Sequence, residues 1–306
     1  MQLITVGDEA AGQRIDNYLL KLLKGVPKSR IYRLLRKGEV RVNKGRIKPE
    51  YKLMDGDSVR VPPIRVAERG APEDVFVSDT LASQLKAAVL FEDERLLIID
   101  KPSGLAVHGG SGVSVGLIEA LRRMRPEERF LELVHRLDRD TSGCVMLAKK
   151  RPTLKTLHGL LRGNGVDKRY LALVEGRWSE RKEQVKLPLA KNILQSGERM
   201  VRVNPEGKYS LTRYEVVQRL PGATLVEAKP ITGRTHQIRV HCQAAGHPII
   251  GDSKYGREEV NEQYRQQGVK RLFLHAHSLS FELEGERISV QAGLSEDLQS
   301  YINKNN

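Results

Sequence analysis

Apolar residues recur at helical spacing in two short segments near the start of the chain. The first pattern covers residues 15–23, and the second ends before Gly38. Polar and apolar residues then alternate over 39–43 and 58–61, which predicts two short strands. We therefore expect a small α/β domain over residues 12–66, in which a helix pair precedes a small sheet.

Apolar runs dominate the chain after residues 67–85, a segment rich in Pro, Glu, Ser and Ala that we expect to be a linker. The second domain, residues 86–306, opens with apolar runs over 88–91 and 96–99 that predict a hairpin. Further strands are predicted over 131–134, 144–148, 170–174, 212–217, 223–228 and 272–275. The clearest helix patterns cover 114–124, 153–162 and 235–245, the last ended by Gly246. Many strands broken by few helices predict an α+β domain with a largely antiparallel sheet.

The composition is that of an ordinary globular protein, with 39% hydrophobic and 29% charged residues among 306. No apolar run reaches the ~18 residues that a membrane span needs, and the first residues lack a secretory pattern. We therefore expect a cytoplasmic protein without a membrane partner. The two cysteines form neither a disulfide framework nor a zinc spacing. No sustained heptad is present, so a monomer is expected.

The chain carries a formal net charge of +14, and its most basic segment lies in the first domain. Residues 21–48 contain eleven basic residues and one acid, Glu39. A solvated charged surface usually mixes both signs, so this one-signed segment favours a nucleic-acid partner.

Two arginines and two acids are packed into the segment HRLDRDTSG, residues 135–143, between two apolar strands. Such a loop is either a structural ion-pair network or a functional site, because buried charges must be paired. A neighbouring guanidinium would hold Asp138 or Asp140 ionised, available as a nucleophile or a base.

A second polar constellation, ITGRTHQIRVH, covers residues 231–241 and includes the last predicted helix. His236, Arg239 and Gln243 share one side of that helix, where Arg239 is suited to clamp a carboxylate or phosphate. The alternative is a surface helix with scattered polar groups. Tyr170 lies in an alternating strand, so it faces either the core or a cleft.

The sequence lacks the residue spacings typical of phosphate-binding loops, zinc sites and serine hydrolases. The glycine-rich segment 101–112 fits neither of the common phosphate-binding patterns, and the histidines lack a zinc arrangement. No GxSxG elbow is present, and Ser142 has no obvious partner base in the sequence. We expect neither a metal nor another cofactor.

Four segments in order resemble the RluA-type family of pseudouridine synthases: KPSG, HRLDRDTSG, KRYLALVEG, and ITGRTHQIRVH followed by GHPIIGD. The first domain, with PKSRIYRLLRKGEVRVNKGRI at its centre, resembles the RNA-binding domain named after ribosomal small-subunit protein four. The resemblance implies a pseudouridine synthase fold and reaction, with large-subunit ribosomal RNA, naked or in a precursor particle, as the partner. The chain departs from the family pattern at Asp100 and Cys144.

The resemblance also implies roles for individual residues. Asp138, and not Asp140, matches the catalytic aspartate; Tyr170 matches the tyrosine beneath the uracil, and Arg239 the arginine paired with the aspartate. Arg136 matches the arginine that contacts and helps displace the target. Arg234, His236 and Gln237 are expected to bind substrate from the segment that carries Arg239. The expected RNA contacts of the first domain are Arg30, Arg33, Arg36, Lys37 and Arg41.

Pseudouridine formation breaks the glycosidic bond, turns the base and rejoins the sugar through C5. Asp138 would attack the anomeric carbon, add to the base, or remove a sugar proton to give a glycal; the sequence leaves these alternatives open. Tyr170 would stack on a flipped-out uridine and assist removal of the C5 proton. Two other functions are weighed: a non-catalytic RNA-binding factor, and a nuclease or base-releasing hydrolase.

Overall fold

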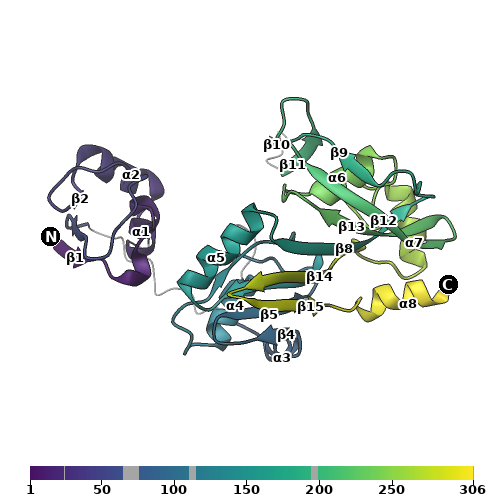
Figure 1. Ribbon diagram of the computed structural model, residues 1–306, viewed down its shortest axis with the longest axis horizontal. Coiled ribbons are helices and arrows are strands. Elements are labelled where there is room, and N and C mark those ends of the chain that lie inside the picture. Colours follow the sequence, from purple (N-terminus) through teal and green to yellow (C-terminus); the bar gives the residue numbers. More distant parts are fainter. Residues whose placement is uncertain (24, 65–75, 110–114, 194–198, 306) are drawn as a thin grey trace. The chain divides into compact units, whose positions relative to one another are not determined.

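The computed structural model describes residues 1–23, 25–64, 76–109, 115–193 and 199–305 (Figure 1). The chain divides into two compact units, Met1–Asp74 and Val75–Asn306. Each unit has its own hydrophobic core.

The first unit contains the expected helix pair and small sheet. Helices α1 (Ile15–Leu22) and α2 (Lys28–Lys37) pack their apolar sides together, with Ile15 and Ile31 fully buried. Helix α2 ends where Gly38 takes a left-handed φ of 70°. The three-stranded antiparallel sheet has the order β1-β3-β2. Its strands are β1 (Gln2–Thr5), β2 (Arg41–Val42) and β3 (Ser58–Val61), with a short 3₁₀ turn η1 (Asp8–Ala10) after β1.

Strand β1 lies before residue 12, where the sequence placed the start of this domain. It pairs with β3 along its whole length, from Gln2 opposite Val61 to Thr5 opposite Ser58. Leu3 stays 67% exposed, so the buried alternation that reveals a strand in sequence is weak here.

The second unit is built on a ten-stranded mixed sheet, in which β7 and β14 are parallel and the other paired strands are antiparallel. The order is β4-β5-β7-β14-β8-β13-β12-β9, with β15 on β14 and β6 on β7. This confirms the predicted α+β class and the largely antiparallel sheet. The strands are β4 (Val89–Glu92), β5 (Leu96–Lys101), β6 (Glu132–Leu133), β7 (Ser142–Ala148), β8 (Val166–Glu175), β9 (Gln184–Lys186), β12 (Leu211–Leu220), β13 (Ala223–Pro230), β14 (Leu274–Leu283) and β15 (Glu286–Gln291).

Further elements of this unit surround the sheet (Figure 1). A separate antiparallel hairpin joins β10 (Leu189–Ile193) to β11 (Arg199–Val203). The helices are α3 (Asp79–Ala87), α4 (Leu117–Met124), α5 (Arg151–Arg162), α6 (Gln237–Ala244), α7 (Glu258–Gln266) and α8 (Glu296–Lys304). Among the described residues no helix is long and apolar enough to cross a membrane.

Three predicted segments differ from the structure. Part of the segment 67–85, expected as a linker, forms α3, which the hydroxyl of Ser78 caps and whose Leu85 is fully buried. The helix predicted over 114–124 begins at Leu117, and residues 110–114 lie outside the described residues. The helix predicted from residue 235 begins at Gln237, because His236 takes a left-handed φ of 51°.

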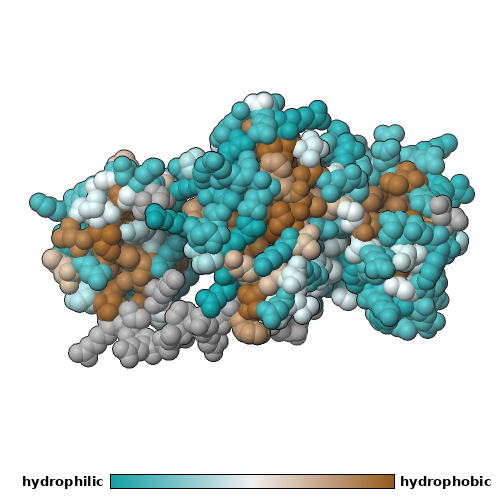
Figure 2. Space-filling view, turned by 90° about the horizontal axis from the view of Figure 1, so that it is seen from below, coloured by the Kyte–Doolittle hydropathy of each residue, from teal (hydrophilic) through white to brown (hydrophobic). Residues whose placement is uncertain are grey.

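Gly143 marks the parallel junction in the middle of the sheet. Its φ is 107°, and a Cβ atom at this position would lie 2.3 Å from the carbonyl oxygen of Ala276 on β14. Only glycine therefore lets β7 and β14 approach closely here. Figure 2 shows one face of the molecule, on which hydrophobic residues reach the surface in several places. The exposed large hydrophobic residues of the first unit include Met1, Leu3 and Met54.

Candidate active site

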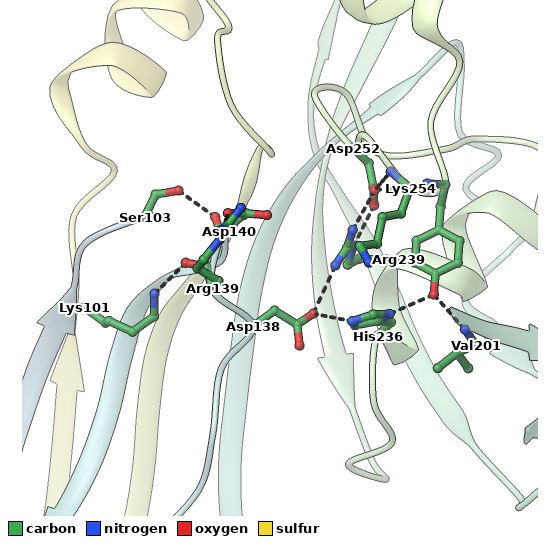
Figure 3. Close-up of polar contacts among 11 residues, drawn as sticks. Lys101, Ser103, Asp138, Arg139, Asp140, Val201, His236, Arg239, Asp252 and Lys254 are labelled. Carbon is green, nitrogen blue, oxygen red and sulfur yellow. Dashed lines mark hydrogen bonds and ion pairs between the residues drawn. The ribbon is translucent and has the colours of Figure 1, made fainter. Parts of the chain in front are cut away.

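Asp138 lies in the loop between β6 and β7, and backbone contacts to this loop hold it in place (Figure 3). The buried ammonium of Lys101 donates to the carbonyl oxygen of Arg139 at 3.0 Å, and the hydroxyl of Ser103 donates to that of Asp140 at 2.7 Å. The amide of Gly104 also donates to Arg139. The KPSG segment thus anchors the loop that carries Asp138.

Arg239 on α6 is shared between two carboxylates. Its Nε and Nη2 each lie 2.7 Å from an oxygen of Asp252, and its Nη1 lies 3.3 Å from Oδ2 of Asp138 (Figure 3). Burial disfavours the charged guanidinium, but the hydrogen bonds and charges of Asp252 and Asp138 outweigh it and raise the pKa of Arg239. The structure therefore brings together Asp138 and Arg239, which lie 101 positions apart in the sequence.

Asp252 fixes Arg239 in place, although the sequence assigns no role to this residue of the GHPIIGD motif. Its side chain is fully buried, and its Oδ1 also accepts from the amides of Lys254 and Tyr255 at 2.9 and 3.0 Å. Gly251 precedes it with a φ of 78°, and a Cβ there would lie 2.0 Å from the carbonyl oxygen of Arg271. The glycine thus permits the close approach that sets Asp252 beneath α6.

His236 connects Asp138 to a second buried group. Its Nε2 lies 3.7 Å from Oδ2 of Asp138, and its Nδ1 lies 2.7 Å from the hydroxyl of Tyr255 (Figure 3). That hydroxyl accepts from the amide of Val201 at 2.9 Å, and its own proton is available for a hydrogen bond to Nδ1. In the tautomer that accepts this proton, neutral His236 carries its ring proton on Nε2, the nitrogen that faces Asp138. Burial lowers the pKa of His236 despite the opposing charge of Asp138.

Gln237 and Arg234 fasten the loop before α6 to the start of β12. The Gln237 amide oxygen accepts from the hydroxyl of Thr232 and the amide of Arg234, and its nitrogen donates to Leu211. Arg234 donates through Nε to the carbonyl oxygen of Tyr209 at 3.0 Å. Both ends of the buried Gln237 amide are thus used within the protein, which favours a positioning role over the substrate contact expected from sequence.

Tyr170 faces the same cavity as Asp138. It lies on β8 and is half-buried; burial and then the charge of Asp138 raise the pKa of its phenol. The cavity has a volume of about 590 Å³, within the usual range for ligand sites. Its lining includes Arg136, Asp138, His158, Arg162, Lys168, Tyr170, Arg234, His236, Gln237 and Arg239.

The structure separates the two acids of the HRLDRD segment. Asp138 lines the cavity, whereas Asp140 lies outside it, half-buried, and pairs at 3.2 Å with its exposed neighbour Arg139. Arg136 is exposed at the cavity wall. The geometry therefore favours Asp138 over Asp140 as the reactive carboxylate.

Ser142 has the partner base that the sequence did not reveal. Its Oγ lies 2.9 Å from Nδ1 of His275, 133 positions away. His275 donates from Nε2 to the carbonyl oxygen of Ala292 at 3.1 Å, and burial lowers its pKa to about 4. Ser142 is only 4% exposed and lies outside the cavity, so the pair joins β7 to β14 and offers no nucleophile to a substrate. Among the described residues no group of three His, Cys, Asp or Glu is placed to hold a metal.

The basic residues of the first unit form an exposed surface on α2. Arg30, Arg33, Arg36 and Lys37 are exposed and have no ion-pair partner within the described part of the chain. Arg41 differs from them, because it donates to the carbonyl oxygens of Gly38 and Lys44 and closes the turn after α2. The four α2 side chains are therefore free to contact phosphates, whereas Arg41 is partly committed to the fold.

Comparison with known families identifies both units. Residues 95–244 match the RNA pseudouridylate synthase family, and residues 13–59 match the S4 domain. The chain belongs to the RNA pseudouridylate synthase family and carries an S4 domain before its catalytic unit, which confirms the resemblance seen in the sequence. It is therefore a pseudouridine synthase, an isomerase that acts on RNA.

Curated relatives cover nearly the whole chain. It is 59% identical to ribosomal large subunit pseudouridine synthase C of Yersinia pestis, over 98% of this chain and 94% of the relative. It is 56% identical to the protein of the same name from Escherichia coli K12, over 99% and 96%.

Two solved structures share the catalytic fold. Human RNA pseudouridylate synthase domain containing 4 has a TM-score of 0.61 and 25% identity over 74% of this chain and 95% of its own. Human RNA pseudouridylate synthase domain containing 1 has a TM-score of 0.57 and 27% identity, over 68% and 83%.

Proposed function

We propose that this pseudouridine synthase converts specific uridines of large-subunit ribosomal RNA to pseudouridine, as a monomer in the cytoplasm. The observation that carries the site is the Asp138–Arg239 pair in a cavity that Tyr170 also lines. The names of the full-length relatives support the choice of ribosomal RNA, and the exposed cations of α2 support binding to RNA.

The reaction breaks the bond between C1′ and N1 and forms one between C1′ and C5. C5 loses its hydrogen and N1 gains one, so the atoms balance within the uridine and solvent. Asp138 assists the first step as a nucleophile toward the sugar or base, or as a base toward a sugar proton. Arg239, itself fixed by Asp252, orients the Asp138 carboxylate and stabilises its charge.

Tyr170 provides the surface on which the uracil turns. Stacking needs only the ring, and the raised pKa of Tyr170 keeps the phenol protonated near neutral pH. A paired or stacked uridine hides its glycosidic bond, so the nucleotide must be flipped into the cavity, at a cost of a few kcal/mol. Arg136 at the cavity wall is placed to take the position that the uridine leaves, or to hold its phosphate.

Release of tritium from ribosomal RNA labelled at C5 of uridine tests the reaction directly, because the label leaves only when C5 is rebonded. Wild type and Asp140→Asn should release tritium, whereas Asp138→Asn should lose release by several orders of magnitude and keep its RNA affinity. Asp140 is the matched control, being an acid two positions away that pairs with Arg139 outside the cavity. Naked RNA and a precursor particle are both supplied as substrates.

Full activity of Asp138→Asn would refute the assigned role, and no release by wild type on either substrate would favour a non-catalytic RNA-binding factor. Appearance of free uracil or shortened RNA would instead indicate a hydrolase. Light scattering in solution checks the monomer.

A further inference from the structure

The cavity contains cations of two kinds. Arg239 is neutralised by Asp138 and Asp252, and Arg234 donates to the carbonyl oxygen of Tyr209. Three other cations line the same cavity: Arg136, Arg162 and Lys168. None of these three has a carboxylate or a hydrogen-bond acceptor among the residues that the structure describes. The cavity therefore presents positive charge that the protein itself does not neutralise.

Lys168 is the most unusual of the three, because it is half-buried on β8 while Arg136 and Arg162 are exposed. Two histidines, His135 and His158, line the cavity with it, and neither supplies an anion. His135 accepts from the amide of Met146, and burial together with the charge of Lys168 lowers its pKa to about 3. His158 contacts the carbonyl oxygen of Val134 through Nε2. Burial alone lowers the pKa of Lys168, with no opposing acid.

The cations on the other side of β8 and on the adjacent strand β13 are paired with acidic residues. Arg169 pairs with Glu227 at 2.6 Å and with Asp167 at 3.4 Å, and Lys229 of β13 pairs with Asp167 at 2.7 Å. Successive residues of a strand point to opposite sides of the sheet, so these pairs lie away from the cavity side. The chain thus neutralises the basic residues on one side of β8 and leaves Lys168 without a counter-ion on the other.

A half-buried cation without a counter-ion destabilises a fold unless a ligand supplies the anion. Uracil carries no formal charge at neutral pH, whereas each phosphodiester of RNA carries one negative charge. We propose that Lys168 binds a backbone phosphate of the flipped uridine inside the cavity, while Arg136 and Arg162 contact the RNA backbone nearer the solvent. The proposal deepens the proposed function and rests on it.

The geometry of β8 agrees with this assignment. Lys168 and Tyr170 are two residues apart on one side of the strand, so their Cα atoms are about 6.7 Å apart. A nucleotide whose base packs on Tyr170 therefore has its sugar and phosphate within reach of the flexible Lys168 side chain. The compact ammonium suits a single phosphate oxygen that arrives in varying orientation.

RNA affinity and stability of Lys168→Met, Lys168→Arg and a control, Lys304→Met, test the proposal. Lys304 is an exposed lysine of α8 outside the cavity. Lys168→Met should weaken binding about tenfold and lower the log–log salt slope by about 0.7 to 0.9. Lys168→Arg should keep most of the wild-type affinity and salt slope, and Lys304→Met should leave both quantities unchanged. Because a half-buried charge without a counter-ion is removed, Lys168→Met should unfold no earlier than wild type.

A neutral methylphosphonate placed next to the target uridine identifies the phosphate. It should weaken binding to wild type and have no further effect on Lys168→Met, since both changes remove the same contact. Additive losses at both flanking positions, an unchanged salt slope, or a less stable Lys168→Met with normal RNA binding would each overturn the proposal. Tritium release by wild type separates a failure of this proposal from a failure of the proposed function. If wild type releases tritium, such results reject only the Lys168 contact. If it does not, the proposed function fails, and the Lys168 proposal fails with it.

Discussion

The two oxygens of Asp252 each lie 2.7 Å from the guanidinium of Arg239, closer than the 3.3 Å contact between Arg239 and Asp138. The shorter contacts of the arginine are thus with a buried residue outside the cavity lining, and its longer contact is with Asp138, the proposed reactive carboxylate. The ring of Tyr255, 5.1 Å from the guanidinium, completes its surroundings.

Asp252→Asn should therefore impair catalysis from outside the cavity. It removes the charge that compensates the buried Arg239, so we expect the free energy of unfolding to fall by about 3 kcal/mol and the isomerisation rate to fall by at least tenfold. Denaturant titration and single-turnover tritium release measure the two effects. Asp297→Asn is the control, because Asp297 is exposed at the surface and its pair with the half-buried Arg271 should contribute less than about 1 kcal/mol. Equal effects of the two variants would contradict the role given to Asp252.

Tyr255→Phe should slow isomerisation without weakening RNA binding. The change removes the hydroxyl that bridges the Val201 amide and Nδ1 of His236, so the ring that faces Asp138 loses its fixed orientation. We expect a rate about tenfold lower at saturating RNA, measured by tritium release. Tyr264→Phe, a similarly buried tyrosine whose hydroxyl donates to Pro221, should keep the wild-type rate. A normal rate for Tyr255→Phe would show that His236 is oriented by other contacts.

Acid should destabilise the catalytic unit through its buried histidines. Burial lowers the pKa of His275 to about 4 in the folded chain, against about 6.5 when unfolded. The unfolded state therefore binds more protons below pH 6.5, and the contribution of His275 to stability, complete above that pH, is lost as the pH falls toward 4. At pH 5 this loss amounts to about 2 kcal/mol relative to pH 7.5.

The fluorescence of the single tryptophan, Trp178, reports unfolding of the catalytic unit alone. His275→Gln should lose less stability between pH 7.5 and pH 5 than wild type does. His108→Gln, which replaces an exposed histidine, should follow wild type. An identical pH dependence in all three proteins would rule out His275 as the source.

The exposed cations of α2 should set RNA affinity and its salt dependence without affecting the chemical step. Replacing Arg33 and Arg36 by Gln should lower the log–log salt slope by about 1.4 to 1.8, corresponding to two phosphate contacts. Arg41→Gln should lower it less, because Arg41 donates to Gly38 and Lys44. Filter binding over a range of salt measures the slopes. A double variant with the wild-type slope would remove α2 from the RNA contact.

Much of the sheet could be predicted because its strands are apolar runs. The run over 144–148 and the alternation from Tyr170 mark β7 and β8 well, since these strands are buried in the sheet. Elements with little buried apolar surface gave no such signal. Helix α7 is polar on most of its surface, and β9 has only three residues, so neither was predicted.

The site was predictable where one motif carries both the residue and its neighbours, as in the loop of Asp138. It was not predictable where partners meet only through the tertiary fold. Asp252 reaches Arg239 across a turn, and His275 reaches Ser142 across 133 positions. Gln237 was expected to bind substrate from the segment that carries Arg239, and the fold uses its buried amide in hydrogen bonds with Thr232 and Leu211.

Strand β14 lies between β7, which follows the Asp138 loop, and β8, which carries Tyr170. During synthesis the ribosome must therefore release residues 274–283 before these two halves of the sheet can join. The S4 domain is complete more than two hundred residues earlier. A nascent chain thus gains its RNA-binding unit well before it can modify RNA. A chain truncated before β14 would leave unpaired edges on β7 and β8, and such edges can pair with other chains.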